Sequence, residues 1–174
     1  MNPTQRNPQR YVVDTNTIID LHCGQLLSFV FQLPCIFITT DFIAYELRNP
    51  PFHALSKMGL SVESLSSEQI VEISATLERY DNLSYADSSG LVLAKSKKTI
   101  LITGDELLRH ASVEYGVNSY GTCWLIDYLA DQKLISYAQA IAAYQLIQKN
   151  KRFPPRDECK TLLSKWKQRH KILD

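Results

Sequence analysis

The stretch Tyr11–Asp20, "YVVDTNTIID", decides how this chain is understood. Its first part is a β-branched, apolar run that is typical of a buried strand, and this run ends at Asp14. A helical apolar pattern follows at once, so a carboxylate stands where strand gives way to helix. Asp is a favoured helix N-cap, which would explain Asp14 alone. A functional explanation requires other carboxylates to arrive at the same place.

The rest of the chain repeats this alternation of short strands and helices. Residues 35–39 ("CIFIT"), 99–103 ("TILIT") and 117–121 ("VNSYG") are predicted strands, and 60–65 ("LSVESL") is a weaker one. Helical patterns lie between them and fill the chain after Thr122, with a final helix after Pro154-Pro155. Strands separated by helices of this length indicate right-handed βαβ units and a mainly parallel sheet. We therefore expect a three-layer α/β/α sandwich with additional C-terminal helices.

Length and composition indicate one ordinary globular domain. The 174 residues, 45% of them hydrophobic, suffice for a single core. Residues 1–10 are polar and are expected to be disordered, residues 11–136 to form the main domain, and residues 137–174 a helical extension packed on it. The longest apolar neighbourhood, residues 26–38, is interrupted by Pro34 and is too short to span a bilayer. No signal peptide is evident, so we expect a cytoplasmic protein without membrane contact.

The four cysteines have no CxxC pairing and lie mostly in apolar segments. For a cytosolic protein they are interpreted as reduced thiols. Zinc is a remote alternative.

The charge of the chain is unevenly distributed. Residues 149–174 contain nine Lys and Arg against three acids and carry a net charge of +6, whereas the whole chain carries +1. The preceding residues are therefore acidic, with a net charge of −5. This basic tail is either a solvated helix face or a surface for a polyanion.

Four carboxylates are candidates for a common site. Asp14 and Asp105 each follow an apolar strand, and the carboxyl ends of parallel strands meet at one edge of a sheet, where sites form at the reversal of strand order. Glu46 and Asp87 lie in helical patterns; Glu46 is spaced to point inward, and Asp87 stands near a helix start. Capping or surface roles explain each acid singly.

Together the four acids predict a metal site. Crowded carboxylates repel one another and are costly to desolvate without partners, so a cluster of them must take up protons or bind cations. Hard divalent ions prefer oxygen ligands, which points to one or two Mg²⁺ or Mn²⁺ ions. Such ions activate water for attack on a phosphodiester. The pattern therefore favours a metal-dependent nuclease.

At these residues the chain resembles the PIN domain family. The resemblance is carried by "VVDTNTIIDL" with Asp14 and Asn16, "DFIAYEL" with Glu46, "LSYADSSGLVLA" with Asp87, and "ILITGDELLRHA" with Asp105. The four acids stand in the family's order, and the resemblance runs from Tyr11 through the helix containing Trp124. The segment "YGTCWLIDYLADQKLIS" is similar to VapC-like proteins of the toxin–antitoxin type.

The resemblance implies a Mg²⁺- or Mn²⁺-dependent ribonuclease in which Asp14, Glu46, Asp87 and Asp105 hold the ions directly or through water. Asn16 and Thr103 match polar positions expected to orient water, ligands or a phosphate. The resemblance also implies a homodimer. If the protein is a toxin, a cognate antitoxin protein is expected to place an Arg or Lys near the acids.

Because the four acids repel RNA, a positively charged surface must bind the phosphate backbone near the site. The basic residues proposed for this role are Lys95, Lys97, Lys98, Lys149, Lys151 and Arg152. Tyr144 or Trp166 could stack on bases, although Trp166 shares a helix face with Leu162 and Leu163 that should pack on the domain.

Two other functions remain open from the sequence. One is a catalytically silent PIN-like module that binds RNA or protein. The other is a phosphatase that uses an aspartyl-phosphate, although Asp14-Thr15-Asn16 lacks the second acid of the DxDxT pattern of haloacid-dehalogenase-type enzymes.

Overall fold

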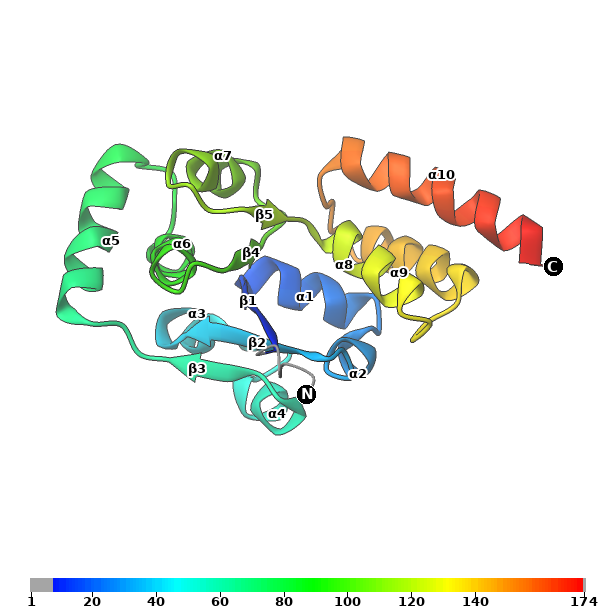
Figure 1. The fold of residues 1–174 in the computed structure, drawn as a ribbon, viewed down its shortest axis with the longest axis horizontal. Helices are drawn as coiled ribbons and strands as arrows, with labels where there is room; N and C mark the ends of the chain where they lie inside the picture. Colours follow the sequence, from blue (N-terminus) through cyan, green and yellow to red (C-terminus); the bar gives the residue numbers. More distant parts are fainter. Residues whose placement is uncertain (1–7, 174) are drawn as a thin grey trace, which may run out of the picture.

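A computed structural model describes residues 8–173, without the side chains of Arg156 and Leu173. Its centre is a parallel sheet in the order β3-β2-β1-β4-β5. The strands are β1 (Gln9–Val13), β2 (Cys35–Thr40), β3 (Ser61–Glu63), β4 (Ile100–Ile102) and β5 (Ser119–Tyr120). Helices cover both faces of this sheet (Figure 1), which confirms the predicted three-layer sandwich.

The helices agree with the sequence patterns at most places. They are α1 (Thr15–Cys23), α2 (Leu27–Val30), α3 (Asp41–Glu46), α4 (Phe52–Met58), α5 (Ser67–Arg79), α6 (Tyr85–Ser96), α7 (Glu106–Glu114), α8 (Thr122–Asp131), α9 (Tyr137–Lys149) and α10 (Arg156–Leu173). Helix α1 ends at its C-cap Gly24, before α2 begins. Helix α4 was not predicted, because two prolines precede it and its apolar stripe is short.

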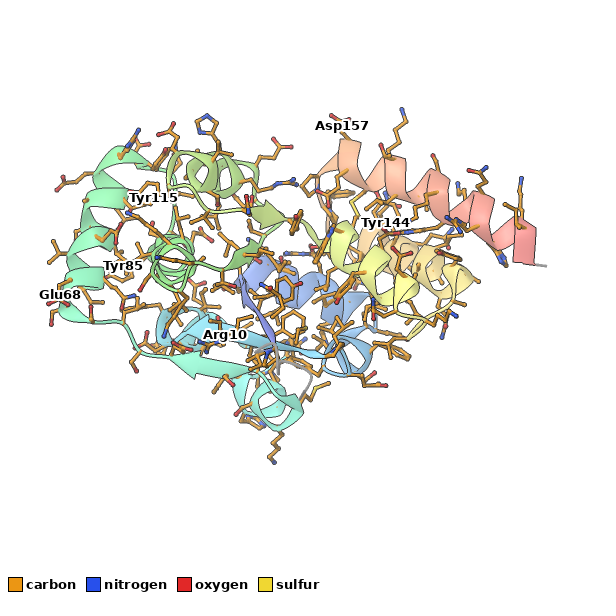
Figure 2. All side chains as sticks on the ribbon, viewed as in Figure 1. Arg10, Glu68, Tyr85, Tyr115, Tyr144 and Asp157 are labelled. Atoms are coloured by element: carbon orange, nitrogen blue, oxygen red, sulfur yellow. A yellow bond between two sulfur atoms is a disulfide. The ribbon has the colours of Figure 1, made fainter. Side chains whose placement is uncertain are left out.

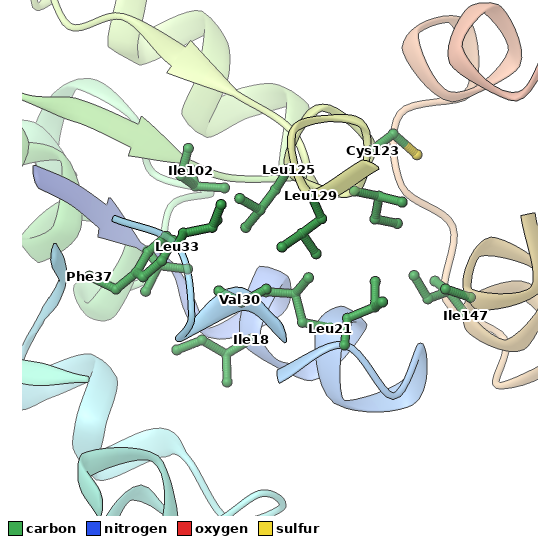
Figure 3. Close-up of a cluster of buried hydrophobic side chains, with 14 of the residues drawn as sticks. Ile18, Leu21, Val30, Leu33, Phe37, Ile102, Cys123, Leu125, Leu129 and Ile147 are labelled. Carbon is green, nitrogen blue, oxygen red and sulfur yellow. The ribbon is translucent and has the colours of Figure 1, made fainter. Parts of the chain in front are cut away.

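The two faces of the sheet take alternate residues of each strand. Tyr11 and Val13 of β1 face the layer of α1, α8 and α9, where the larger core lies (Figure 3), whereas Val12 faces α6 and α7. This is the period-two alternation that a strand buried on both faces must have. The three residues of "YVV" therefore contribute to the hydrophobic cores on both faces of the sheet.

The order of the strands reverses between β1 and β4. From β1 the chain continues to β2 and β3 on one side, and it returns through β4 and β5 on the other. The register pairs Val13 with Ile102, and the backbone N–H of Asp14 donates to the Ile102 carbonyl over 3.2 Å. The carboxyl ends of β1 and β4 thus flank the switch point, where ligand sites of such sheets form.

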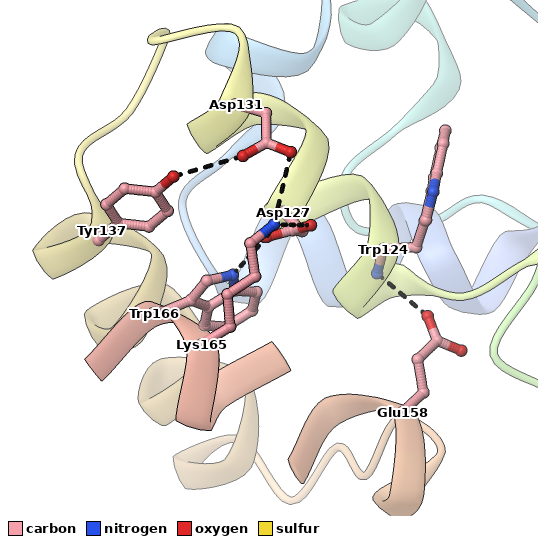
Figure 4. A network of polar contacts seen from close by, with 7 residues as sticks. All are labelled: Trp124, Asp127, Asp131, Tyr137, Glu158, Lys165 and Trp166. Carbon is pink, nitrogen blue, oxygen red and sulfur yellow. Dashed lines mark hydrogen bonds and ion pairs between the residues drawn. The ribbon is translucent and has the colours of Figure 1, made fainter. Parts of the chain in front are cut away.

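The C-terminal helices are fastened to the domain by polar contacts (Figure 4). Trp166 of α10 is fully buried, and its Nε1 donates to Asp127 of α8 over 2.8 Å, while the Lys165 ammonium donates to both Asp127 oxygens. Glu158 accepts the backbone N–H of Trp124 at the start of α8, where Gly121 provides no capping side chain. Residues 137–173 therefore pack against α8 as part of one body.

Two expectations about the chain need correction. Cys123 of α8 and Cys159 of α10 form a disulfide, so the interpretation of all four cysteines as reduced thiols is wrong for this pair, while Cys23 and Cys35 are free. Strand β1 begins at Gln9, inside the segment expected to be disordered, because Gln9 and Arg10 pair with β2. Residues 1–7 lie outside the described part of the chain.

Across residues 8–173, none of the helices combines the length and apolarity required to cross a bilayer.

Candidate functional site

Asp14 lies at the centre of the candidate site. It caps α1: its Oδ1 accepts the Thr17 N–H over 2.6 Å, and its Oδ2 accepts the Thr103 hydroxyl over 2.5 Å. Its side chain is 1% exposed. Burial raises the pKa of Asp14 to about 6 against the opposing effect of these hydrogen bonds, and the Asp87 carboxylate raises it further. The capping explanation of this acid is confirmed, and Asp14 is in addition a buried carboxylate with a raised pKa at the switch point.

Asp105 is linked to Asp14 through one hydroxyl. Thr103, fully buried at the end of β4, donates to Asp14 and accepts the Asp105 N–H over 3.1 Å. The Asp105 carboxylate is half-buried and caps α7 by accepting the Leu108 N–H over 2.7 Å. The two acids predicted to follow neighbouring strands thus stand side by side at the switch point.

Asp87 approaches Asp14 from α6. It forms a capping box with Ser84, in which Asp87 Oδ2 accepts the Ser84 hydroxyl over 2.7 Å. This confirms the capping interpretation of Asp87, and its influence on the pKa of Asp14 brings its charge into the same site. Asp87 is therefore a helix cap whose charge also acts on Asp14.

Glu46 reaches the site less directly. It is exposed at the end of α3 and accepts the hydroxyl of Thr15, the neighbour of Asp14, over 3.1 Å. The expected inward orientation is wrong, because α3 ends at Glu46 and the next residue, Leu47, is buried instead. Glu46 lies at the rim, one hydroxyl away from Asp14.

The donor set fits a hydrated hard cation better than an ion held by the protein alone. Within residues 8–173 no group of three or more His, Cys, Asp and Glu side chains is arranged to hold a metal ion. Mg²⁺ keeps several waters and takes one or two carboxylates directly. A buried Asp14 whose charge is opposed by burial and by Asp87 suits such an ion.

A second cluster, not predicted from the sequence, adjoins the acids. Asp20 of α1 is 4% exposed and accepts Arg152 Nε over 2.7 Å and the Thr122 hydroxyl over 3.0 Å. Burial raises the pKa of Asp20, and the Arg152 guanidinium opposes that rise. Arg152 Nη2 also donates to Asn16 Oδ1 over 2.9 Å. No sequence signal identified Asp20, because its partners Thr122 and Arg152 lie 102 and 132 residues away along the chain.

The Asp20–Arg152 cluster opens onto Asp105. A pocket of about 180 Å³ is lined by Asn16, Asp20, Gly104, Asp105, Arg152, Phe153 and Pro154. It brings the end of β4, the first turns of α1 and the linker between α9 and α10 to one place. The linker is where the basic tail begins.

The other basic residues lie in two places. Lys95, Lys97 and Lys98 lie at the far end of α6, just before β4, and hence at the sheet edge opposite the acids; Lys95 pairs with Glu72 and Lys97 with Glu63. Lys149 and Lys151 are exposed beside Arg152. Of the six proposed cations, Arg152 is the one that lines the pocket at Asp105.

The expected aromatic contacts with bases are wrong. Trp166 is fully buried and Tyr144 is 7% exposed, within the packed C-terminal helices (Figure 2). An exposed aromatic residue that lines the pocket at Asp105 is Phe153, which is 67% exposed and next to Arg152. Its position before two prolines, outside any apolar periodicity, was the one sequence signal for it.

Comparison with known proteins identifies the family of the chain. A family model described as the PIN domain matches residues 10–168, which includes most of the segment 137–174 that we expected to be an extension. A solved PilT N-terminus domain protein from the hyperthermophilic archaeon Sulfolobus solfataricus P2 is similar at 14% identity and a TM-score of 0.48, over 70% of this chain and 93% of that one. No curated protein matches. Since the family model spans nearly the whole chain, this protein belongs to the PIN domain family.

Proposed function

We propose that this protein is a Mg²⁺- or Mn²⁺-dependent ribonuclease. PIN domains are commonly nucleases and generally use divalent metals. The observation that carries the proposal is the position of Asp14: a buried carboxylate at the switch point, with its pKa raised to about 6 and with Asp87 and Asp105 beside it. A cation would stabilise this buried charge. A carboxylate that only caps a helix does not require such a cation.

The proposed chemistry assigns a role to each residue of the site. Asp14 and Asp87 would hold the cation, and Asp105 and Glu46 would act through its waters, with one or two ions in all. A divalent ion there supplies a lowered pKa for the attacking water and charge stabilisation for the leaving oxygen. Thr103 fixes the orientation of Asp14 by its hydrogen bond, and Asn16 and Thr103 would orient water or a phosphate. No protein nucleophile is needed, so aspartyl-phosphate chemistry is not proposed.

Glu46→Gln tests the metal-assisted hydrolysis. The substitution is isosteric and its site is exposed, so folding is unaffected, and RNA cleavage is expected to fall about 10- to 100-fold at fixed Mg²⁺ because a carboxylate that orients metal-bound waters is lost. The measurement is the cleavage rate of a labelled single-stranded RNA across a Mg²⁺ titration, with EDTA as a blank. Glu78→Gln is the control, since Glu78 is exposed on α5 near the end of its helix, as Glu46 is on α3. Equal rates for the two variants and the wild type would contradict the proposal.

Arg152 is proposed to hold a phosphate of the substrate. Its Nε and Nη2 bond to Asp20 and Asn16, and among the described residues no partner is recorded for Nη1. The guanidinium is 28% exposed at the pocket beside Asp105. Asp20 fixes the guanidinium so that its remaining donors stay available to an anion.

The double variant Arg152→Gln with Asp20→Asn tests this contact without leaving a buried charge unpaired. Its KM for RNA is expected to rise about tenfold, and the logarithmic salt dependence of binding to become shallower by about one unit of slope. Asp20→Asn alone is the control, since it keeps the cation. If the double variant and this control show the same KM and salt slope, Arg152 is only a structural partner of Asp20.

We also propose, from the VapC-like segment, that the protein is the toxin of a toxin–antitoxin pair, that it has a cognate antitoxin, and that it forms a homodimer. Exposed apolar side chains such as Tyr45 and Val113 support contacts with other chains. A small DNA-binding protein encoded beside the gene would support the pairing.

A further inference from the structure

We infer that Phe153 and the hollow beside it form a subsite for one base of single-stranded RNA, next to the phosphate held by Arg152. This inference rests on the proposed ribonuclease function and adds a preference for bases that carry an exocyclic amino group. This recognition of a base is separate from the binding of metal by the acids and of phosphate by basic side chains.

The first observation is the continuity of two hollows. The 180 Å³ pocket at Asp105 shares Phe153 and Pro154 with a neighbouring hollow of about 640 Å³, lined by Glu106, Arg109, Phe153, Pro154, Pro155, Asp157 and Glu158. The smaller one suits a phosphate beside Arg152, and the larger one has room for a base. Arg152 would thus contact the phosphate of a nucleotide, and the next residue, Phe153, would contact its base.

The second observation is the exposure of Phe153. Its ring is 67% exposed, although it stands in a linker whose next residue, Pro154, is buried. An exposed ring at a nuclease cleft is a stacking platform, because every base has a face that stacks on an aromatic side chain. The two prolines that follow restrict the backbone and keep the ring at the rim of the cleft.

The third observation is the charge of the lining. Glu158 is engaged by Arg109, Nη1 to Oε2 at 2.7 Å, and by the N–H of Trp124, whereas Glu106 and Asp157 are exposed in the first turns of α7 and α10. Asp157 lies at the end of α10 that is nearest to α7 (Figure 2). Their carboxylates accept hydrogen bonds, so they favour the amino groups of adenine, cytosine and guanine. Uracil presents carbonyl oxygens there and is disfavoured.

Binding of short single-stranded RNA tests the stacking. Fluorescence anisotropy of labelled oligo(A), oligo(C) and oligo(U) is measured with Ca²⁺ in place of Mg²⁺, and the strands are checked for integrity afterwards. Phe153→Ala is expected to weaken binding about tenfold, Phe153→Trp to restore it, and Val71→Ala, which removes an apolar side chain that is 70% exposed on α5, to leave it unchanged. Equal affinities for wild type and Phe153→Ala would overturn the subsite.

The base preference is tested with Glu106→Gln combined with Asp157→Asn. The wild type is expected to bind oligo(A) and oligo(C) about tenfold more tightly than oligo(U), and the double variant to lose this ratio while binding oligo(U) at least as well. An unchanged ratio, or no preference in the wild type, would overturn the carboxylate readout.

Cleavage assays separate this inference from the function on which it rests. A wild type that binds RNA with the expected preference but does not cut it refutes the ribonuclease and keeps the subsite. A wild type that cuts RNA with the same KM and base preference as Phe153→Ala refutes the subsite and keeps the ribonuclease.

Discussion

Asp14→Asn is expected to raise the free energy of unfolding of the metal-free protein by about 2 kcal/mol at pH 7.5. The buried Asp14 carboxyl has its pKa raised from 3.8 to about 6, so its charged form costs the folded state roughly 3 kcal/mol relative to the unfolded chain. Asn carries no charge and still caps α1 through the Thr17 N–H, although the bond with Thr103 is remade less well. The measurement is urea unfolding in EDTA.

The direction in which the stability changes with pH follows from the raised pKa of Asp14. Between pH 3.8 and about 6 the folded protein binds more protons at Asp14 than the unfolded chain does, so stability falls as pH rises through this window. The advantage of Asp14→Asn should therefore vanish near pH 4, grow up to pH 6 and remain constant above it. Asp41→Asn, which removes an exposed acid in the first turn of α3, should show no such gain. A destabilised Asp14→Asn at pH 7.5 would mean that Asp14 is a structural cap alone.

The same substitution should weaken metal binding and RNA cleavage, although it stabilises the metal-free protein. Added Mg²⁺ is expected to stabilise the wild type by mass action and to have little effect on Asp14→Asn, whose amide is a poorer ligand. Cleavage of RNA should be abolished in the variant while its fold is intact. A gain of stability together with a loss of activity distinguishes a functional carboxylate from one that merely holds the helix.

The sequence allowed the sheet and its edge to be predicted because these depend on local patterns. Short apolar runs specified the strands, and the position of Asp14 and Asp105 directly after two of them placed both acids at one edge. That step needed only the rule that parallel strands end on the same side. The sequence could not show that Thr103 links Asp14 and Asp105, because the hydrogen bond from Thr103 to Asp14 joins residues that are 89 positions apart.

The parts that were missed depend on contacts between distant segments. Asp20 and Arg152 are separated by 132 residues, and nothing near either one indicates the other. Cys123 and Cys159 likewise meet only because α10 folds back on α8. Phe153 has no periodic neighbours, so its exposure follows from where the linker runs rather than from its composition.

Trp166→Ala is expected to be the most destabilising single substitution of the C-terminal helices, at about 4 kcal/mol. The indole is fully buried between α10 and the domain, and truncating so large a side chain leaves a cavity that the surrounding side chains fill only in part. Urea unfolding under non-reducing conditions measures the loss. Trp166→Phe is the matched control; it keeps most of the packing and loses the bond to Asp127, so it should cost about 1 kcal/mol.

The same variant connects the anchoring of α10 to the site. Residues 152–155 run directly into α10, which is held by the Trp166–Asp127 contact and by the disulfide at Cys159. In Trp166→Ala the disulfide still holds the first turns of α10, so the KM for RNA should change little. Reduction should then release the linker and raise the KM towards that of the Arg152 and Asp20 double variant. If Trp166→Ala with a reduced disulfide keeps a wild-type KM, Arg152 reaches the pocket without help from α10, and the C-terminal helix only completes the core.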